Sequence, residues 1–161
     1  MTERLLQFIW QFQYFNKSEP ATETGERLEI IFPGQFNCNQ GPDFSDAKIK
    51  IADTTWAGNV ELHLKTSDWN KHRHHEDSNY NNVILHVVWE NDEAEINSIP
   101  VFQLKERVSK ILLQRYEELM NAGGFIACEN SIHDVRDIIW KSWKERLLVE
   151  RLVRKAKAVE H

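Results

Sequence analysis

Two alternating segments followed by a continuous apolar one constrain the fold most strongly. Residues 44–52 and 59–65 each alternate apolar and polar side chains, which is the pattern of strands with one buried face. Residues 53–55 separate them and have the length and composition of a turn, so a hairpin is predicted. Residues 83–89 are rich in β-branched and apolar side chains, which indicates a strand buried on both faces. The middle of the chain therefore predicts a sheet.

Helical patterns flank these strands. Apolar residues recur at helical spacing in residues 5–15, with Thr2 as a plausible N-cap. The other predicted elements are strands at 27–32 and 99–104, a polar loop at 35–41, a short helix within 66–80, and helices at 106–120 and 133–159. Pro100 favours an edge position for its strand. We expect an α/β fold: a small mixed sheet flanked by helices in residues 1–105, followed by a helical segment at 106–161.

Composition narrows the class of protein. The chain has 41% hydrophobic and 28% charged residues, which is typical of a globular domain. A net charge of −5 argues against binding nucleic acid through overall basicity, although an acidic metal site is compatible with it. Cys38 and Cys128 form no disulfide or metal-binding pattern, and no apolar run approaches the length of a membrane span. A cytoplasmic protein without membrane contact is expected.

Two acids and a histidine have the spacing of a metal site. Asp43 precedes the first strand of the predicted hairpin, and Glu61 lies in the second, where His63 shares its face. Two carboxylates on neighbouring strands can hold a hard divalent cation. In a regular strand Asp43 would lie on the same face as the apolar residues at 47, 49 and 51. The site therefore needs a bulge near residues 44–46, or Asp46 as the ligand. The competing interpretation is that Asp43 ends a turn and Glu61 faces solvent.

A histidine-rich segment offers an alternative metal site. His72, His74 and Asp77 could bind zinc if further ligands come from elsewhere in the fold. His63 and His86 are the candidates for those ligands. The competing interpretation is an exposed segment whose charges are solvated. For His86, which lies in the predicted buried strand, a hydrogen-bonded core histidine is favoured over a ligand.

Several blocks of sequence resemble an uncharacterised bacterial family of unknown function. The blocks are Gly41-Pro42-Asp43-Phe44, Gly58-Asn59-Val60-Glu61-Leu62-His63, Ser67-Asp68-Trp69, His72-Arg73-His74 and Val83-Ile84-Leu85-His86-Val87-Val88. The resemblance covers nearly the whole chain. It implies a longer protein of which these residues are the N-terminal part, and it brings no activity with it.

The order of elements also resembles the PD-(D/E)XK nuclease superfamily, whose restriction-endonuclease-like core is a helix, a three-stranded meander, a helix and a strand. Pro42-Asp43 corresponds to the PD pair and Glu61-Leu62-His63 to the (D/E)XK triplet. The resemblance implies that Asp43 and Glu61 bind Mg²⁺ with the Leu62 carbonyl. His63 stands in the lysine position, where it could act as a general base or bind a softer ion such as Mn²⁺ or Zn²⁺. Nearby lysines could supply the missing charge: Lys48, Lys50 or Lys65.

These patterns favour a divalent-metal-dependent phosphodiesterase of the nuclease type acting on DNA or RNA. Its expected catalytic residues are Asp43, Glu61, His63 and Lys65. Two alternatives stay open: a non-catalytic module that binds nucleic acid or protein on the same scaffold, and a zinc-binding structural domain. The amphipathic 133–159 helix, which is basic near its end, could mediate a homo-oligomer or pack against a missing C-terminal domain.

Overall fold

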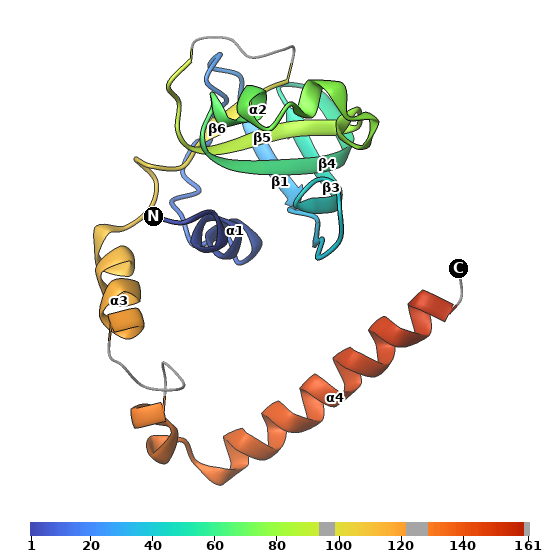
Figure 1. Ribbon diagram of the computed structural model, residues 1–161. Coiled ribbons are helices and arrows are strands. Elements are labelled where there is room, and N and C mark those ends of the chain that lie inside the picture. The colour runs from blue at the N-terminus through green and yellow to red at the C-terminus, as the bar shows by residue number, and fades with distance from the viewer. Residues whose placement is uncertain (94–98, 122–128, 160–161) are drawn as a thin grey trace. The chain divides into compact units, whose positions relative to one another are not determined.

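The computed structural model describes residues 1–93, 99–121 and 129–159, and the chain divides into two compact units, Met1–Leu112 and Leu113–His161 (Figure 1). The first unit contains the sheet and all the candidate site residues named above. The described part of the second unit is helical. The candidate site is therefore a property of the first unit alone.

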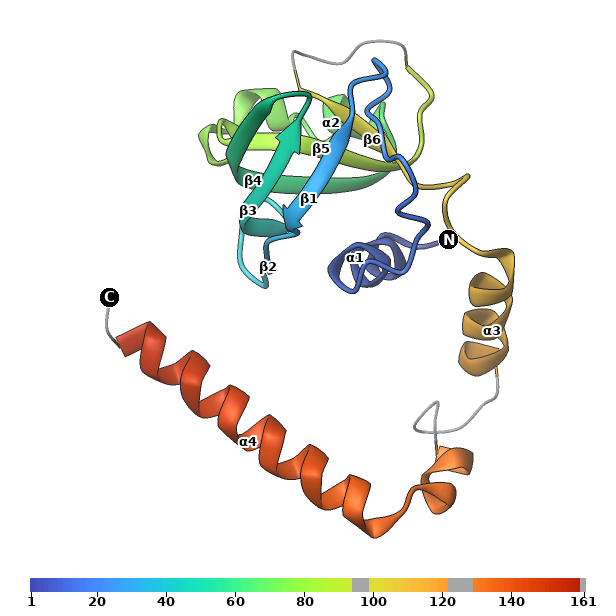
Figure 2. The same cartoon turned by 180° about the vertical axis from the view of Figure 1, so that it is seen from behind.

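The first unit is built on one mixed sheet (Figure 2). Its strands lie in the order β1 (Leu28–Phe32), β3 (Phe44–Ile51), β4 (Thr54–Lys65), β5 (Val83–Glu90) and β6 (Val101–Gln103). β1, β3 and β4 are antiparallel, whereas β5 is parallel to β4 and β6 is parallel to β5. The mixed α/β class is thus confirmed, and β6 occupies the edge position that Pro100 favours.

A short additional strand lies where a loop is predicted. β2 (Gln35–Phe36) pairs with the start of β3, because Phe36 packs its ring against Phe44 with 5.5 Å between the ring centroids. Cys38 follows as an exposed free thiol, and Cys128 lies outside the described residues.

The predicted hairpin is formed by β3 and β4. Ile51 pairs with Thr54, so the connection is only Ala52 and Asp53, and Ala52 takes a φ of +50°. β4 therefore begins at Thr54 rather than at residue 59, because its β-branched threonines join the ladder directly after the tight turn.

β3 is irregular close to the candidate site. Its register against β4 shifts between Phe44 and Ala47, and Asp46 lies in that interval with a φ of +58°. The shift changes which side chains share a face, and this is the bulge that the strand parity of Asp43 requires. Asp46 itself is exposed.

α1 (Glu3–Gln11) packs its apolar side against β4. The buried side chains of the helix are Leu5, Leu6, Ile9 and Trp10. Thr2 is the N-cap, as expected, because its hydroxyl accepts a hydrogen bond from the Leu5 N–H at 3.3 Å. The helix ends at Gln11 rather than at residue 15, because Gln13 takes a φ of +54° that is incompatible with helix.

The connection between β4 and β5 carries the histidine-rich segment. In place of the single helix predicted within 66–80 it has three short turns: α2 (Asp68–Lys71) and the 3₁₀ turns η1 (His74–Glu76) and η2 (Ser78–Tyr80). Arg73 takes a φ of +59°, which ends α2 and redirects the chain. Trp69 anchors the segment, since its side chain is 2% exposed and packs with Val83.

β4 is covered on both faces where it carries the candidate site. Residues Val60 to His63 are all buried, and successive strand residues point to opposite faces. α1 and α2 both contact β4, and the ring of His63 lies against Trp69 of α2. Glu61 and His63 therefore point to the α2 face.

The helices after the sheet begin later than predicted. α3 (Lys110–Asn121) is preceded by a turn in which Arg107 donates to the carbonyls of Ser18 and Glu19, so residues 106–109 are held outside the helix. α4 (Asp137–Val159) follows the 3₁₀ turn η3 (Glu129–Asp134). Among the described helices, none is both long enough and apolar enough to cross a membrane. Most large apolar side chains of α4 are exposed, whereas Trp140 is half-buried; the exposed ones are Ile138, Ile139, Trp143, Leu147, Leu148, Val149, Leu152 and Val153.

Candidate metal site

Asp43 and Glu61 meet where β3 begins beside β4. The backbone N–H of Asp43 donates to Glu61 Oε2 at 2.9 Å, and the backbone N–H of Leu62 donates to Asp43 Oδ2 at 3.2 Å. The other oxygen of Asp43, Oδ1, accepts a hydrogen bond from Gln7 Nε2 of α1 at 2.7 Å. The two acids singled out in the sequence thus lie together, and both oxygens of Asp43 already have protein donors.

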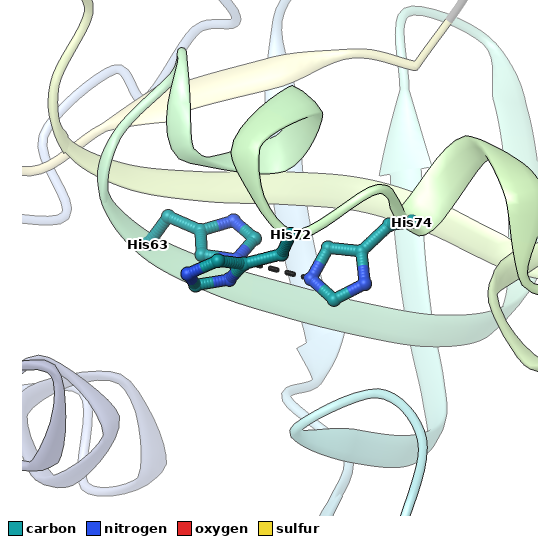
Figure 3. A group of neighbouring side chains, drawn as sticks. All are labelled: His63, His72 and His74. Carbon is teal, nitrogen blue, oxygen red and sulfur yellow. Dashed lines mark hydrogen bonds between the residues drawn. The ribbon is translucent and has the colours of Figure 1, made fainter.

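Three imidazoles cluster on the α2 face of β4 (Figure 3). His63 Nε2 lies 3.0 Å from His72 Nδ1 and 3.2 Å from His74 Nε2. One nitrogen atom of each ring lies within 4.8 Å of the others. Imidazole nitrogens are common ligands of divalent transition metals, and this triad could hold such an ion.

Glu61 connects the acids to the histidines. Its Oε2 accepts the Asp43 N–H, whereas its Oε1 lies 3.6 Å from His63 Nε2 and 3.5 Å from His74 Nε2. The side chain is buried, with 6% of the residue exposed. The acid pair and the histidine segment, which the sequence presents as alternative sites, therefore form one continuous cluster.

The backbone turn at Arg73 brings two of the histidines to this cluster. His72 is the C-cap residue of α2, and the left-handed Arg73 returns the chain so that His74 opens η1 beside it. Tyr80 then stacks on His74, with 3.8 Å between the ring centroids. Trp69 also contacts His74, with 5.2 Å between the ring centroids. These contacts restrict the directions of the imidazole rings.

His86 of β5 contacts His63 from the neighbouring strand. His63 Nδ1 lies 2.8 Å from His86 Nε2, and both residues are 1% exposed. When His63 donates its Nδ1–H to His86, the lone pair of its Nε2 is directed at the other two imidazoles. His86 is thus the hydrogen-bonded core histidine expected from the sequence.

The two carboxyl groups are held towards their protonated forms. Burial raises the pKa of Glu61 to about 8, and the charge of Asp43 adds to this rise, although the hydrogen bond from the Asp43 amide opposes it. Burial likewise raises the pKa of Asp43 to about 6, against the hydrogen bonds from Leu62 and Gln7. At neutral pH without a bound cation, Glu61 is therefore largely protonated.

The buried imidazoles are held neutral. Burial and then the neighbouring histidines lower the pKa of His63 to about 2. Burial also lowers the pKa of His74 to about 4 and that of His86 to about 4. The contacts of Glu61 with His63 and His74 are therefore not ion pairs at neutral pH. Neutral rings offer unprotonated nitrogens, which is the form that binds metal.

The lysines named in the sequence analysis lie outside this set of contacts. Lys65 shares the strand face of Glu61 but is exposed, and its Nζ lies 3.8 Å from Asp92 Oδ2. Lys48 is exposed on β3. Lys50 lines a separate surface pocket together with Arg27 and Glu29.

Two further acids considered as ligands have other positions. Asp77 caps η2, since its carboxylate accepts a hydrogen bond from the Asn79 N–H at 2.9 Å. It is outside the histidine triad, although its charge acts on His74. Asp46 is exposed in the β3 bulge.

Gln7 and Trp69 belong to the site environment without having been predicted. Gln7 interrupts the apolar pattern of the N-terminal helix, and that interruption is the sequence signal that could have pointed to a polar contact. Trp69 is buried among the imidazoles, and its indole N–H has no hydrogen-bond partner within the described part of the chain. Nothing in the sequence separates this tryptophan from one used in an ordinary core.

The fold and site define a small mixed α/β protein with a histidine-lined candidate metal site on one face of its sheet. A family-level sequence profile matches residues 3–161, so the chain belongs to the protein family of unknown function DUF2851. No curated protein and no solved structure matches the chain. The predicted resemblance to an uncharacterised family is thereby confirmed, and the resemblance to PD-(D/E)XK nucleases stays a prediction.

Proposed function

We propose that this protein is a divalent-metal-dependent phosphodiesterase of the nuclease type, acting on DNA or RNA. The observation that carries the proposal is the meeting of Asp43 and Glu61, joined through backbone hydrogen bonds, with His63 on the same strand face as Glu61. Paired acids on adjacent strands beside a third donor are what hydrolysis at a metal-bound phosphate needs.

The order of elements supports the same proposal. α1 is followed by the antiparallel strands β1, β3 and β4, then by α2, then by β5 parallel to β4. This matches the helix, meander, helix and strand of the nuclease core that the sequence resembles. Asp43 directly precedes β3, and the triplet Glu61-Leu62-His63 lies inside β4, in keeping with the resemblance.

A bound divalent ion would supply Lewis-acid stabilisation of the charge that develops on the phosphoryl oxygens. The residues of the chain hold the ion and orient the cluster around it. His63 differs from the lysine of the resembled pattern, because its neutral, buried ring carries no positive charge at neutral pH. In this proposal charge neutralisation falls to the ion, and Lys65, which is 52% exposed, contacts only the outer part of a polynucleotide.

The test is a cleavage assay with single- and double-stranded DNA and RNA in Mn²⁺, Zn²⁺ or Mg²⁺. Asp43→Asn is expected to lower the cleavage rate by roughly 100-fold or more, as when one charge-stabilising group is removed from a hydrolytic site. Asp46→Asn is the matched control: this acid is exposed three positions away, and asparagine tolerates its positive φ. Cleavage that survives in Asp43→Asn would exclude the proposed site.

A zinc-binding structural domain is the second candidate, and the gathering of three imidazoles from two chain segments favours it. If the ion is structural, chelation should unfold the protein and none of the three ions should support cleavage. Binding of a nucleic acid without cleavage in any of the three ions would instead favour the non-catalytic module.

A further inference from the structure

We infer that the ion of this site is held by three imidazoles, through His63 Nε2, His72 Nδ1 and His74 Nε2, and that Glu61 Oε1 lies beside two of them. Such a donor set selects a divalent transition metal of the zinc class rather than Mg²⁺. The inference concerns the site of the proposed function and rests on that function for its catalytic meaning, although metal binding can be measured without a substrate.

The carboxylates fit Mg²⁺ poorly. Mg²⁺ requires a nearly regular octahedron of oxygen atoms. Both oxygens of Asp43 accept protein hydrogen bonds, from Gln7 and Leu62, and Glu61 Oε2 accepts the Asp43 N–H. The one carboxylate oxygen left, Glu61 Oε1, has imidazole nitrogens as its nearest neighbours. The Mg²⁺ that the nuclease resemblance implies would therefore find imidazole nitrogens beside the least engaged carboxylate oxygen, in place of the further oxygen ligands that it prefers.

The separations within the cluster fit one zinc-class ion. Ligands about 2.0–2.1 Å from a tetrahedral ion lie roughly 3.3–3.4 Å from one another. His63 Nε2 lies 3.0 Å from His72 Nδ1 and 3.2 Å from His74 Nε2. Glu61 Oε1 lies 3.6 Å from His63 Nε2 and 3.5 Å from His74 Nε2. The two imidazole separations lie just below the expected value, and the three ring nitrogens all lie within 4.8 Å of one another, so side-chain movements can bring them onto one ion.

The rings are also oriented before the ion binds. His86 accepts at 2.8 Å from His63 Nδ1 in the arrangement that leaves His63 Nε2 free, which is the usual contact behind a ligating histidine. Tyr80 stacks on His74. His72 is the exposed member of the triad, so it marks the side from which an ion can enter.

The test uses the full chain freed of metal, titrated calorimetrically with Zn²⁺ and, separately, with Mg²⁺. We expect one Zn²⁺ per chain, bound at least roughly 100-fold more tightly than Mg²⁺. His72→Ala and His74→Ala are each expected to weaken Zn²⁺ binding by roughly 100-fold or more, since each removes a ligand. The matched control is His75→Ala, because His75 is exposed on the same segment and lies outside the triad.

Cobalt provides a readout of geometry that does not depend on the variants' stability. Co²⁺ bound to the parent chain should give the strong visible absorption of a four-coordinate ion and should be displaced by stoichiometric Zn²⁺. Mg²⁺ binding as tight as that of Zn²⁺, or Zn²⁺ binding unchanged in both His72→Ala and His74→Ala, would overturn the inference. Stoichiometric Zn²⁺ with no cleavage of any nucleic acid would support the inference and remove the proposed function instead.

Discussion

Glu61 is a buried acid between two kinds of neighbour. One of its oxygens accepts the Asp43 N–H, and the other faces His63 and His74. Burial together with the charge of Asp43 raises its pKa to about 8. Without a cation the folded state therefore keeps a proton on this carboxyl that the unfolded chain releases at much lower pH.

A loss of stability with rising pH follows for the metal-free protein. Below the ordinary pKa of 4.5 the Glu61 carboxyl is protonated in both the folded and the unfolded chain, so it costs no stability. As pH rises from there towards about 8, only the unfolded chain releases this proton, and the free energy of unfolding falls. Between pH 6.5 and 8 the free energy of unfolding should fall by roughly 2 kcal/mol, at about 1.4 kcal/mol per pH unit. Urea unfolding in a chelating buffer at several pH values measures this fall.

The pH window separates Glu61 from its neighbours. Asp43, with a pKa of about 6, has largely ionised below the window, and the lowered pKa values of His63, His74 and His86 affect stability only below 6.5. Glu61→Gln should abolish the fall. An equal slope in Glu61→Gln and the parent would assign the fall to another group.

At the scale of elements, the β3 bulge lies close to the residue that opens the site. The register shift between Phe44 and Ala47 lies directly after Asp43, and Asp46 adopts a φ of +58° within it. A left-handed backbone at a residue other than glycine costs about 1 kcal/mol or more, and a β-branched side chain raises that cost. The bulge therefore depends on what residue 46 tolerates.

Substitution at Asp46 tests this dependence. Asp46→Val should destabilise the protein by roughly 1–2 kcal/mol, because valine resists the positive φ. Asp46→Gly should be close to neutral, because glycine adopts this conformation without strain. Chemical unfolding of both variants gives the comparison. Equal stability of Asp46→Val and the parent would mean that the bulge is not under this constraint.

The elements differ in how far the sequence could predict them. The hairpin, β5 and the edge strand follow from hydrophobic period, and the parity of Asp43 even required the bulge. The merging of the acid and histidine sites could not be foreseen, because it depends on the short α2 and on the left-handed Arg73. Helix propensity and hydrophobic period favour a single helix within residues 66–80. Gln7 was missed for a similar reason, since its partner Asp43 lies on another element.

At the scale of the whole molecule, the site residues and the sheet belong to one compact unit. Met1–Leu112 contains α1 and every strand of the described sheet, and Leu113–His161 begins inside α3. The boundary predicted from the sequence lies after residue 105, where the predicted strands end and the predicted helices begin, because hydrophobic periodicity shows only this change of element. Compactness also depends on contacts such as that of Arg107 with Ser18 and Glu19, which keep the next residues with the sheet.

A fragment of residues 1–112 is expected to keep the fold and the metal site. Its circular dichroism should retain the strand signal, and its Zn²⁺ affinity should stay within roughly threefold of the full chain, since all three imidazoles are present. α4 exposes a row of apolar side chains, including Trp143 at 60%. We therefore expect the full chain to self-associate and the fragment to sediment as a monomer. A fragment that folds but binds no Zn²⁺ would contradict this division.

The contacts of Glu61 with both Asp43 and His74 have an evolutionary consequence. The charge of Asp43 adds to the rise that burial causes in the pKa of Glu61, and His74 lies 3.5 Å from Glu61 Oε1. Replacing either Asp43 or His74 would change the surroundings of the Glu61 carboxyl and so its interaction with the remaining neighbour. Single replacements would therefore be selected against, whereas paired ones would be tolerated. Among descendants of a common ancestor, positions 43, 61 and 74 should therefore change together or remain together.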